Sequence, residues 1–335
     1  MKDTIRWGII GAGKIARKFA ADLMLVENAT LAAIASRTQE HADIFGDEFQ
    51  VPIRYASYDA LVADPSIDVV YIATPHVFHF EHTMLCLSHG KAVLCEKPFA
   101  MNEEQVLAMI AKAKQQNVFL MEALWSAFLP HFLKLKELLS QQVIGEITAM
   151  QSNFGFKINE QASPRLYEKN LGGGTLLDIG IYNVFFVTEV MGLPDEIEAS
   201  AVFNESGSDM QCDIHFNYDN GSVAHLFSTF KAHIPIEAQI FGTEGNIKLT
   251  QRFYEPSCDI MISRDGGKNY ETVEVSERKG FGYQYEAQHV TDCLLQGLTE
   301  SPVMTFYRSV ELMKVLDAVR SGIGLSYPQD HKNFM

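Results

Sequence analysis

A glycine-rich turn between an apolar strand and a helix constrains the fold of this chain more than any other feature. Residues 5–10 form a mostly apolar run, and the pattern G-x-G-x-x-A follows at 11–16. Gly11 permits a tight turn, Gly13 lets a pyrophosphate approach the first amide groups of the helix, and Ala16 lets that helix pack close to the strand. The strand before and the helical spacing after favour a dinucleotide-binding turn over a chance glycine turn.

The end of the next strand indicates which dinucleotide binds. The strand expected at 30–35 is followed by Ser36, Arg37 and Thr38, where NAD enzymes commonly place an acid for the ribose 2′-hydroxyl. Arg37 can neutralise a 2′-phosphate, with the two hydroxyls as further donors. The sequence therefore predicts NADP, with NAD the less favoured cofactor. The alternative is that Arg37 stacks on the adenine and does not distinguish NADP from NAD.

A third strand end supplies candidates for the nicotinamide half of the cofactor. The buried run at 69–72 leads to Thr74, Pro75, His76 and His79. Ligands bind beyond the carboxyl ends of the strands in an open parallel sheet, so these residues are expected to contact the cofactor. Either histidine is also open to a purely structural role.

The apolar run that begins at residue 92 ends in the charged pair Glu96 and Lys97, followed by Pro98. This pattern predicts a buried strand with Lys97 at its end, next to a cleft. Pro98 restricts the backbone of Lys97, because a residue before proline is disfavoured in the helical region. The alternative is a strand-terminal lysine in solvent.

The whole chain divides into two predicted domains. Strands and helices alternate through residue 122, which predicts a Rossmann-type, doubly wound parallel sheet in a dinucleotide-binding domain at 1–122. From residue 147 the apolar period changes to two, which predicts a large, mainly antiparallel open sheet within an α+β domain at 123–335. Helical spacing returns near 283–295 and 306–319. These helices are too few to cover both faces of the large sheet, so one face is left uncovered. We expect two chains to form a homodimer through that face, and we assign substrate binding and dimerisation to this domain.

The second domain carries an acid and a phenol at helical spacing. Three glycines at 172–174 open a predicted helix on which Asp178 and Tyr182 are four residues apart and share one face. A buried acid and phenol are costly unless paired, so they either serve chemistry or simply bond each other or the backbone.

The residues expected to line a substrate pocket lie in the same domain. Residues 124–128 are expected to open a helix, on which Trp125 either walls the pocket or packs at a hinge. Phe154, on one face of the strand that begins near residue 147, and Asn183, next to the acid and phenol pair, complete this set.

Four separated motifs together resemble the Gfo/Idh/MocA oxidoreductases over essentially the whole chain. They are G-x-G-x-x-A at 11–16, A-T-P-x-x-x-H at 73–79, E-K-P at 96–98 and G-G-G-x-x-x-D-x-G-x-Y at 172–182. Many members carry histidine where this chain has Tyr182, whereas the dihydrodiol dehydrogenase and glucose-fructose oxidoreductase branches carry tyrosine. The chain is most similar to the dihydrodiol and D-xylose dehydrogenase branch, but it has Ala127 where close relatives often have arginine, which leaves the substrate open.

The resemblance implies NADP-linked oxidation of a secondary alcohol in a sugar or vicinal diol. Tyr182 is then the acid/base, Lys97 lowers its pKa through positive charge, and Asp178 holds both in position. In the alternative assignment Lys97 is the acid/base and the other two place the substrate. The predicted cofactor-binding residues are Gly11, Gly13, Lys14, Ile15, Ser36, Arg37, Thr38, Thr74, Pro75, His76, His79, Glu96 and Lys97.

The net charge and the cysteine content limit which partners, metal sites and cellular locations are expected for this chain. The formal net charge of −15 argues against nucleic acid or an anionic membrane as partner. Five scattered cysteines with no C-x-x-C pair suit reduced thiols in a cytoplasmic protein and indicate no metal site. The chain shows no signal-peptide layout and no apolar run long enough to span a bilayer. The rival hypothesis is a catalytically idle NADP-binding regulator on the same fold.

Overall fold

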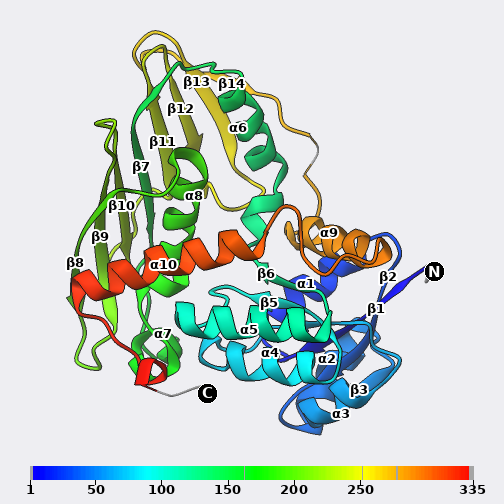
Figure 1. The fold of residues 1–335 in the computed structure, drawn as a ribbon. Coiled ribbons are helices and arrows are strands. Elements are labelled where there is room, and N and C mark those ends of the chain that lie inside the picture. Colours follow the sequence, from blue (N-terminus) through cyan, green and yellow to red (C-terminus); the bar gives the residue numbers. More distant parts are fainter. Residues whose placement is uncertain (1–2, 162, 251, 277, 332–335) are drawn as a thin grey trace. The chain divides into compact units, whose positions relative to one another are not determined.

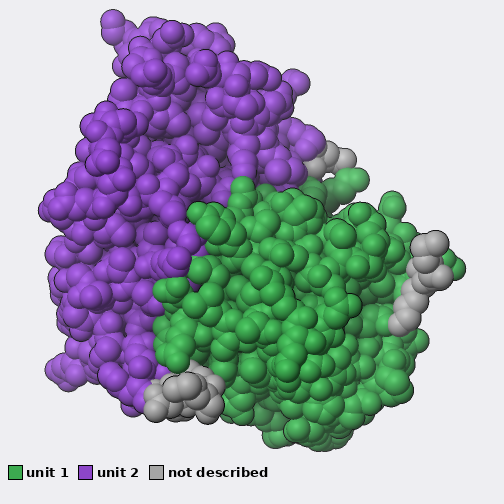
Figure 2. All heavy atoms as spheres, viewed as in Figure 1, with its two compact units in different colours: residues 1–127, 279–310, 333–335 green, residues 128–278, 311–332 purple. Residues whose placement is uncertain are grey.

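The computed structural model describes residues 3–161, 163–250, 252–276 and 278–331. The chain forms two compact units, which Figure 2 shows in different colours. Unit 1 contains residues 1–127, 279–310 and 333–335, and unit 2 contains 128–278 and 311–332. Each unit is described here by itself.

Unit 1 is built on a six-stranded parallel sheet with the strand order β3-β2-β1-β4-β5-β6 (Figure 1). The strands are β1 (Ile5–Ile10), β2 (Ala29–Ala35), β3 (Ile53–Tyr55), β4 (Val69–Ile72), β5 (Ala92–Glu96) and β6 (Leu120–Ala123). The order reverses between β1 and β4, so the carboxyl ends of these two strands form the crevice in which such sheets bind ligands. The predicted doubly wound parallel sheet is confirmed.

Side-chain caps fix where the helices of unit 1 begin. Ser57 accepts from the Ala60 N–H at the start of α3, and Asn102 accepts from the Gln105 N–H at the start of α5. The Gln105 amide oxygen accepts from the Met101 N–H, one residue earlier than in the usual capping box. The helices are α1 (Lys14–Leu23), α2 (Gln39–Phe49), α3 (Tyr58–Ala63), α4 (His79–Ser88), α5 (Glu103–Gln116) and α9 (Tyr283–Leu295), with the short turns η1 (His76–Phe78) and η2 (Trp125–Phe128).

The late segment 279–310 packs within unit 1. The sequence predicted instead that the whole of 123–335 forms the second domain. The Asp22 carboxylate accepts from the N–H groups of Phe281 and Tyr283, and Trp7 Nε1 donates to Thr291 Oγ1 at 3.3 Å. The helix at 283–295 was predicted, but its spacing shows only that one face is apolar and not what that face covers.

Unit 2 is built on an eight-stranded sheet with the strand order β14-β13-β12-β11-β7-β10-β9-β8 (Figure 1). Every pair is antiparallel except the central pair β7 and β10, so the predicted mainly antiparallel sheet is confirmed. The strands are β7 (Ile147–Gly155), β8 (Glu196–Phe203), β9 (Asp209–Asn217), β10 (Val223–Thr229), β11 (Glu237–Gly242), β12 (Asn246–Thr250), β13 (Asp259–Ser263) and β14 (Glu271–Val273).

The first helix of unit 2 begins later than the sequence predicted. Residues 125–128 form only the turn η2, and α6 (Pro130–Ser140) begins at a proline, which suits the first turn of a helix because it donates no hydrogen bond. The remaining helical elements are α7 (Pro164–Tyr167), η3 (Lys169–Leu171), η4 (Leu176–Gly180), α8 (Ile181–Met191), α10 (Phe306–Ile323) and η5 (Pro328–His331).

Helix α8 forms the core of unit 2 against the sheet, with Phe132 of α6 packed on its Phe185 and Phe186 rings. The segment Lys169–Met191 is long and apolar enough to cross a membrane by length and composition, yet 83% of its most apolar window is buried inside the protein. Its apolar character is therefore explained by core packing.

The two faces of this sheet have different surroundings. On β9, Cys212, Ile214 and Phe216 are buried, and α8 packs on β7 and β10. Asp213 and His215 alternate with those residues and project from the other face, where they are partly exposed. In Figure 1, α6 and α8 lie on the same side of the sheet.

Candidate functional site

The glycine turn after β1 has the geometry that a pyrophosphate needs. Gly11 has a φ of +98°, and a Cβ there would lie 2.9 Å from the Ala73 carbonyl oxygen. A Cβ on Gly13 would meet nothing within 4 Å, so this residue faces open space at the first turn of α1. The amide groups at the start of α1 are therefore accessible to an anion, as in dinucleotide-binding folds. These residues fit the predicted cofactor.

A cavity of about 540 Å³ lies beside this turn in unit 1. Six predicted cofactor residues line it, namely Gly11, Gly13, Ser36, Arg37, Thr74 and Pro75. No acidic residue is among the described residues that line it. The preference for NADP over NAD stays a prediction.

Other residues of this cavity were missed by the sequence analysis. They are Ala12, Arg17, His41, Ile44, Tyr58, Ala73, Phe78 and His82. Arg17 follows Gly13 by one helical turn, so the period of α1 was a usable signal for it. Tyr58 and His82 come from two different helices and pack edge to face at 4.8 Å, and nothing in the local sequence indicates that pairing.

Several predicted cofactor residues lie outside the lining of this cavity, namely Lys14, Ile15, Thr38, His76, His79, Glu96 and Lys97. Thr38 caps α2, where its hydroxyl accepts from the His41 N–H at 3.3 Å. His79 is fully buried, and its ring nitrogens lie 2.9 Å from the Thr74 carbonyl oxygen and 2.8 Å from the Pro98 carbonyl oxygen. Burial lowers the pKa of His79 to about 4. Because both ring nitrogens face backbone carbonyl oxygens, the contacts of His79 support its structural alternative.

Lys97 follows β5 directly, and its surroundings hold its backbone in place. Its N–H donates to Glu96 Oε2 at 3.2 Å, and the peptide bond to Pro98 is cis. Glu96 also accepts from the Tyr71 hydroxyl. One residue past the proline, the Phe99 N–H donates to Glu122 Oε1 at 3.0 Å.

Two buried carboxyl groups of unit 1 have strongly shifted titration. Burial raises the pKa of Glu122 to about 7. Glu286, on α9, is fully buried, and burial together with the nearby charges of Glu96 and Asp22 raises its pKa well above the usual range. Neither carboxyl oxygen of Glu286 has a hydrogen-bond partner among the described residues. Burial without a partner among the described residues therefore favours the protonated form of Glu286.

The acid and phenol of unit 2 lie on consecutive helical elements. Asp178 is in η4, a single π-helical turn and not the α-helix that the sequence predicted, and Tyr182 is in the first turn of α8. Asp178 Oδ1 accepts from Arg165 Nη2 at 2.8 Å, a partner that the sequence analysis missed. Tyr182 is buried with its ring 4.7 Å from that of Tyr254. π-Helical turns occur frequently at functional sites.

Lys97 belongs to unit 1, whereas Asp178 and Tyr182 belong to unit 2. Asp178 and Tyr182 lie four residues apart on the consecutive elements η4 and α8. Cooperation of Lys97 with this pair stays a prediction.

The three predicted substrate residues have different surroundings. Trp125 is buried and stacks on Tyr283 within unit 1 at 4.4 Å with an interplanar angle of 8°, which favours the packing role. Phe154 lies 5.8 Å from the Tyr182 ring and stays a candidate wall of the pocket.

Asn183 has a structural role that the sequence did not reveal. Its amide oxygen accepts from Ser152 Oγ at 2.8 Å, and its Nδ2 donates to the Phe227 carbonyl oxygen at 3.1 Å. The oxygen and the nitrogen of this buried amide both hold α8 to the sheet. These bonds account for the presence of a buried asparagine at position 183 without contact with a substrate.

Comparison with known proteins gives consistent results for both units. The model of an oxidoreductase family with an NAD-binding Rossmann fold, Gfo/Idh/MocA, matches residues 5–124, and the Gfo/Idh/MocA C-terminal domain matches 132–248. The chain is 39% identical over 329 residues to trans-1,2-dihydrobenzene-1,2-diol dehydrogenase of Xenopus tropicalis, covering 96% of this chain and 99% of that protein. It is 34% identical over 336 residues to the enzyme of that name from Homo sapiens, covering 98% and 99%.

Solved structures extend this comparison. A 3-ketoreductase from Actinomadura kijaniata, solved in complex with NADP and TDP-benzene, is 26% identical with a TM-score of 0.85, covering 96% of this chain and 98% of that one. An aldose-aldose oxidoreductase from Caulobacter crescentus, complexed with glycerol, has a TM-score of 0.86 at 23% identity, covering 95% and 97%, and it shows the shared fold alone.

Proposed function

Because this chain belongs to the Gfo/Idh/MocA oxidoreductase family, we propose that it is an NADP-preferring dehydrogenase that acts on a secondary alcohol of a sugar or vicinal diol. The observation that carries the proposal is the 39% identity to a dihydrodiol dehydrogenase over 96% of this chain.

NADP, when bound, supplies the hydride acceptor for such an oxidation. Hydride leaves a carbinol carbon readily only if the hydroxyl proton is removed in the same event, so the chain must provide a base. We assign this role to Tyr182, whose phenol is buried among the rings of Phe154 and Tyr254. In the proposal the positive charge of Lys97 lowers the phenol pKa, and Asp178, fixed by Arg165, orients the pair. The alternative keeps Lys97 as the proton carrier.

The proposed preference for NADP rests on the cavity beside the glycine turn. Arg37 and Ser36 line this cavity at the end of β2, where NAD enzymes commonly have an acid. A guanidinium and a hydroxyl at this point favour a 2′-phosphate.

The decisive experiment supplies a panel of sugars and vicinal diols with NADP or NAD and follows the absorbance of the reduced nicotinamide. We expect turnover with at least one such alcohol and a higher kcat/KM with NADP. Tight NADP binding without turnover on any member of the panel would instead support the idle regulator.

Two further features of the molecule belong to the same proposal. We propose a homodimer through the sheet face of unit 2 opposite α8, because the side chains of that face alternate with buried residues and are only partly covered within the unit. We also propose a cytoplasmic location, which the five free, buried cysteines support.

A further inference from the structure

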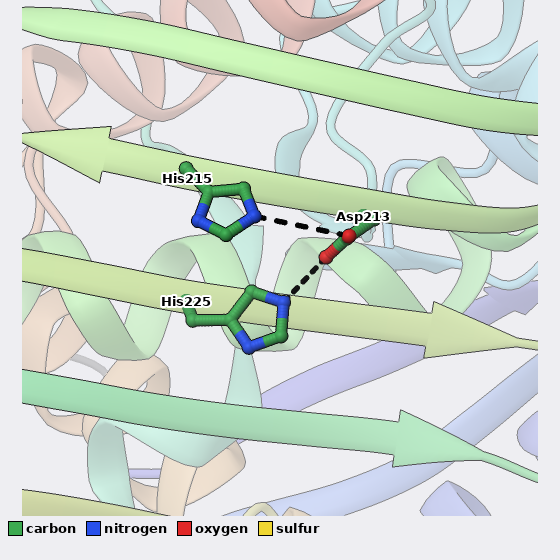
Figure 3. Close-up of side chains that lie close together, drawn as sticks. All are labelled: Asp213, His215 and His225. Carbon is green, nitrogen blue, oxygen red and sulfur yellow. Dashed lines mark hydrogen bonds and ion pairs between the residues drawn. The ribbon is translucent and has the colours of Figure 1, made fainter.

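Two histidines and an aspartate meet on the face of the eight-stranded sheet opposite α8. Figure 3 shows Asp213 and His215 on one strand, β9, and His225 on its neighbour, β10. His215 and His225 are directly opposite each other in the register, and Asp213 lies two residues before His215 on the same face. We propose that these three side chains bind a divalent transition-metal ion, with Zn²⁺ as the ion that suits them best.

The ligand atoms converge without help from any other element. His225 Nε2 lies 2.5 Å from Asp213 Oδ1, and His215 Nε2 lies 3.8 Å from Asp213 Oδ2. One ligand atom from each of the three residues falls within 4.8 Å of the others. Zinc bound to nitrogen and oxygen at about 2.0–2.2 Å in a tetrahedron separates its ligands by roughly 3.3 Å, which lies between the two measured distances. Small side-chain rotations are therefore enough to coordinate an ion.

The backbone that carries the three residues is held on both sides. β9 pairs with β8 and β10, and β10 pairs with β9 and β7, so neither strand is at the edge of the sheet. The imidazole rings stack with centroids 4.6 Å apart and an interplanar angle of 21°, and Figure 3 shows both turning a nitrogen toward the carboxylate. A site prearranged in this way loses little conformational entropy when the ion binds.

The charges around the cluster also favour a cation. Glu198 of β8 pairs with His215 in the register, and the neutral Ser200 and Gln151 pair with Asp213 and His225. None of these register partners is basic, and the whole chain carries a formal charge of −15. Within a single chain the three side chains are 39–54% exposed, which leaves the fourth position of a tetrahedral ion open to a further ligand.

The donor atoms select the class of metal. Two imidazole nitrogens and one carboxylate oxygen suit zinc, copper and nickel, whereas magnesium and calcium prefer oxygen ligands alone. The sequence analysis found no metal site because it searched for ligands close together in the chain, whereas His215 and His225 come together only through the pairing of β9 with β10.

Isothermal titration calorimetry of the chelator-treated, full-length chain tests the proposal. We expect wild-type protein to bind one Zn²⁺ per chain with micromolar affinity, and to bind Mg²⁺ at least a hundredfold more weakly. Asp213→Asn and His225→Gln should each weaken zinc binding at least tenfold. His89→Gln, at an exposed histidine after α4, is the matched control and should leave the affinity unchanged.

Thermal unfolding provides a second measurement that does not depend on the heat of binding. Zinc should raise the Tm of the wild type and of His89→Gln, and the increase should be absent in the two cluster variants, because a ligand stabilises only the state that it binds. Circular dichroism verifies that each variant is folded, and His215→Gln replaces any that is not. Failure of folded wild-type protein to bind zinc, or equal affinity in the cluster variants, would overturn the proposal.

Discussion

Tyr182 and Lys97 are the residues on which the proposed proton chemistry depends, and each is fixed by its own local contacts. Lys97→Met, Asp178→Asn and Tyr182→Phe should each lower kcat by about 10²–10⁴-fold, the usual effect of losing a general acid or base. NADP affinity, measured by fluorescence titration, should change little. Double variants should lose much less than the product of the single effects, because one loss already disables the proton transfer.

The pH dependence of turnover separates the two assignments of the proton carrier. If Tyr182 is the acid/base, its limb of the pH-rate profile disappears in Tyr182→Phe. If that limb persists in Tyr182→Phe and disappears in Lys97→Met, Lys97 is the carrier. Near-native turnover in Lys97→Met would contradict both assignments.

Arg37 governs the expected choice of cofactor. Arg37→Ala should raise KM for NADP by about 10–100-fold and change KM for NAD far less, since a charge-assisted contact contributes about 1.5–3 kcal/mol. Steady-state kinetics with both cofactors measures the two effects. Equal changes for NADP and NAD would show that Arg37 only stacks on the adenine.

Glu286 makes the stability of unit 1 depend on pH. Its pKa is raised in the folded protein, so the folded state holds a proton that the unfolded state loses above about pH 4.3. This residue therefore destabilises the fold increasingly as pH rises. Glu286→Gln should unfold at higher urea than the wild type at pH 8, with a much smaller difference at pH 4.5.

Glu274→Gln, at an exposed glutamate, is the control for that measurement and should follow the wild type at both pH values. A difference between Glu286→Gln and the wild type that is the same at pH 4.5 and pH 8 would mean that Glu286 is ionised in the fold.

At the scale of elements, the stability of α5 depends on the side chain before its first turn. Asn102 accepts from the Gln105 N–H at 3.0 Å, so Asn102→Ala should lower the free energy of unfolding by about 1 kcal/mol. Urea denaturation measures this loss. Asn102→Asp keeps an acceptor at the cap and should retain most of the stability, and a loss as large as that of alanine would count against capping.

Elements with a strong local pattern were predictable from the sequence, and those defined by distant contacts were not. The glycine turn before α1 and the helix α9 were both predicted. Strand β8 lies at the sheet edge, and it was missed although exposed and half-buried residues alternate from Glu196 to Ala201, because none of its side chains is fully buried and its apolar residues are few. The π-helical turn η4 was missed because its residues have an ordinary helical composition.

At the scale of the whole molecule, the candidate site could also be predicted only where a local sequence pattern marks its residues. The six predicted residues that line the cavity could be selected from the sequence because each follows a strand end, and their contact with a cofactor stays a prediction. Arg165 lies 13 residues before Asp178, and His215 and His225 face each other across the hairpin of β9 and β10, so both pairs depend on loop geometry and strand register and not on a motif at fixed spacing. The division of the chain was also predicted only in part, because 279–310 returns to unit 1.

The proposed homodimer is tested by light scattering at micromolar concentrations. We expect about twice the chain mass of 37.5 kDa. Phe227→Lys, on the sheet face opposite α8, should shift the molecule toward the monomer, since it places a charge in the proposed interface. Ser88→Lys, at an exposed position in α4, is the control. A monomeric wild type at all concentrations would exclude the dimer.

The return of the segment 279–310 to unit 1 has a consequence for biosynthesis. Roughly 150 residues separate it from the rest of that unit, so at about 5–20 residues per second the ribosome needs roughly 8–30 s to supply it. Until then Asp22 lacks the backbone donors of Phe281 and Tyr283, and Trp7 lacks Thr291. The nascent unit 1 therefore lacks α9, which packs on α1 and β1, until most of unit 2 has been synthesised.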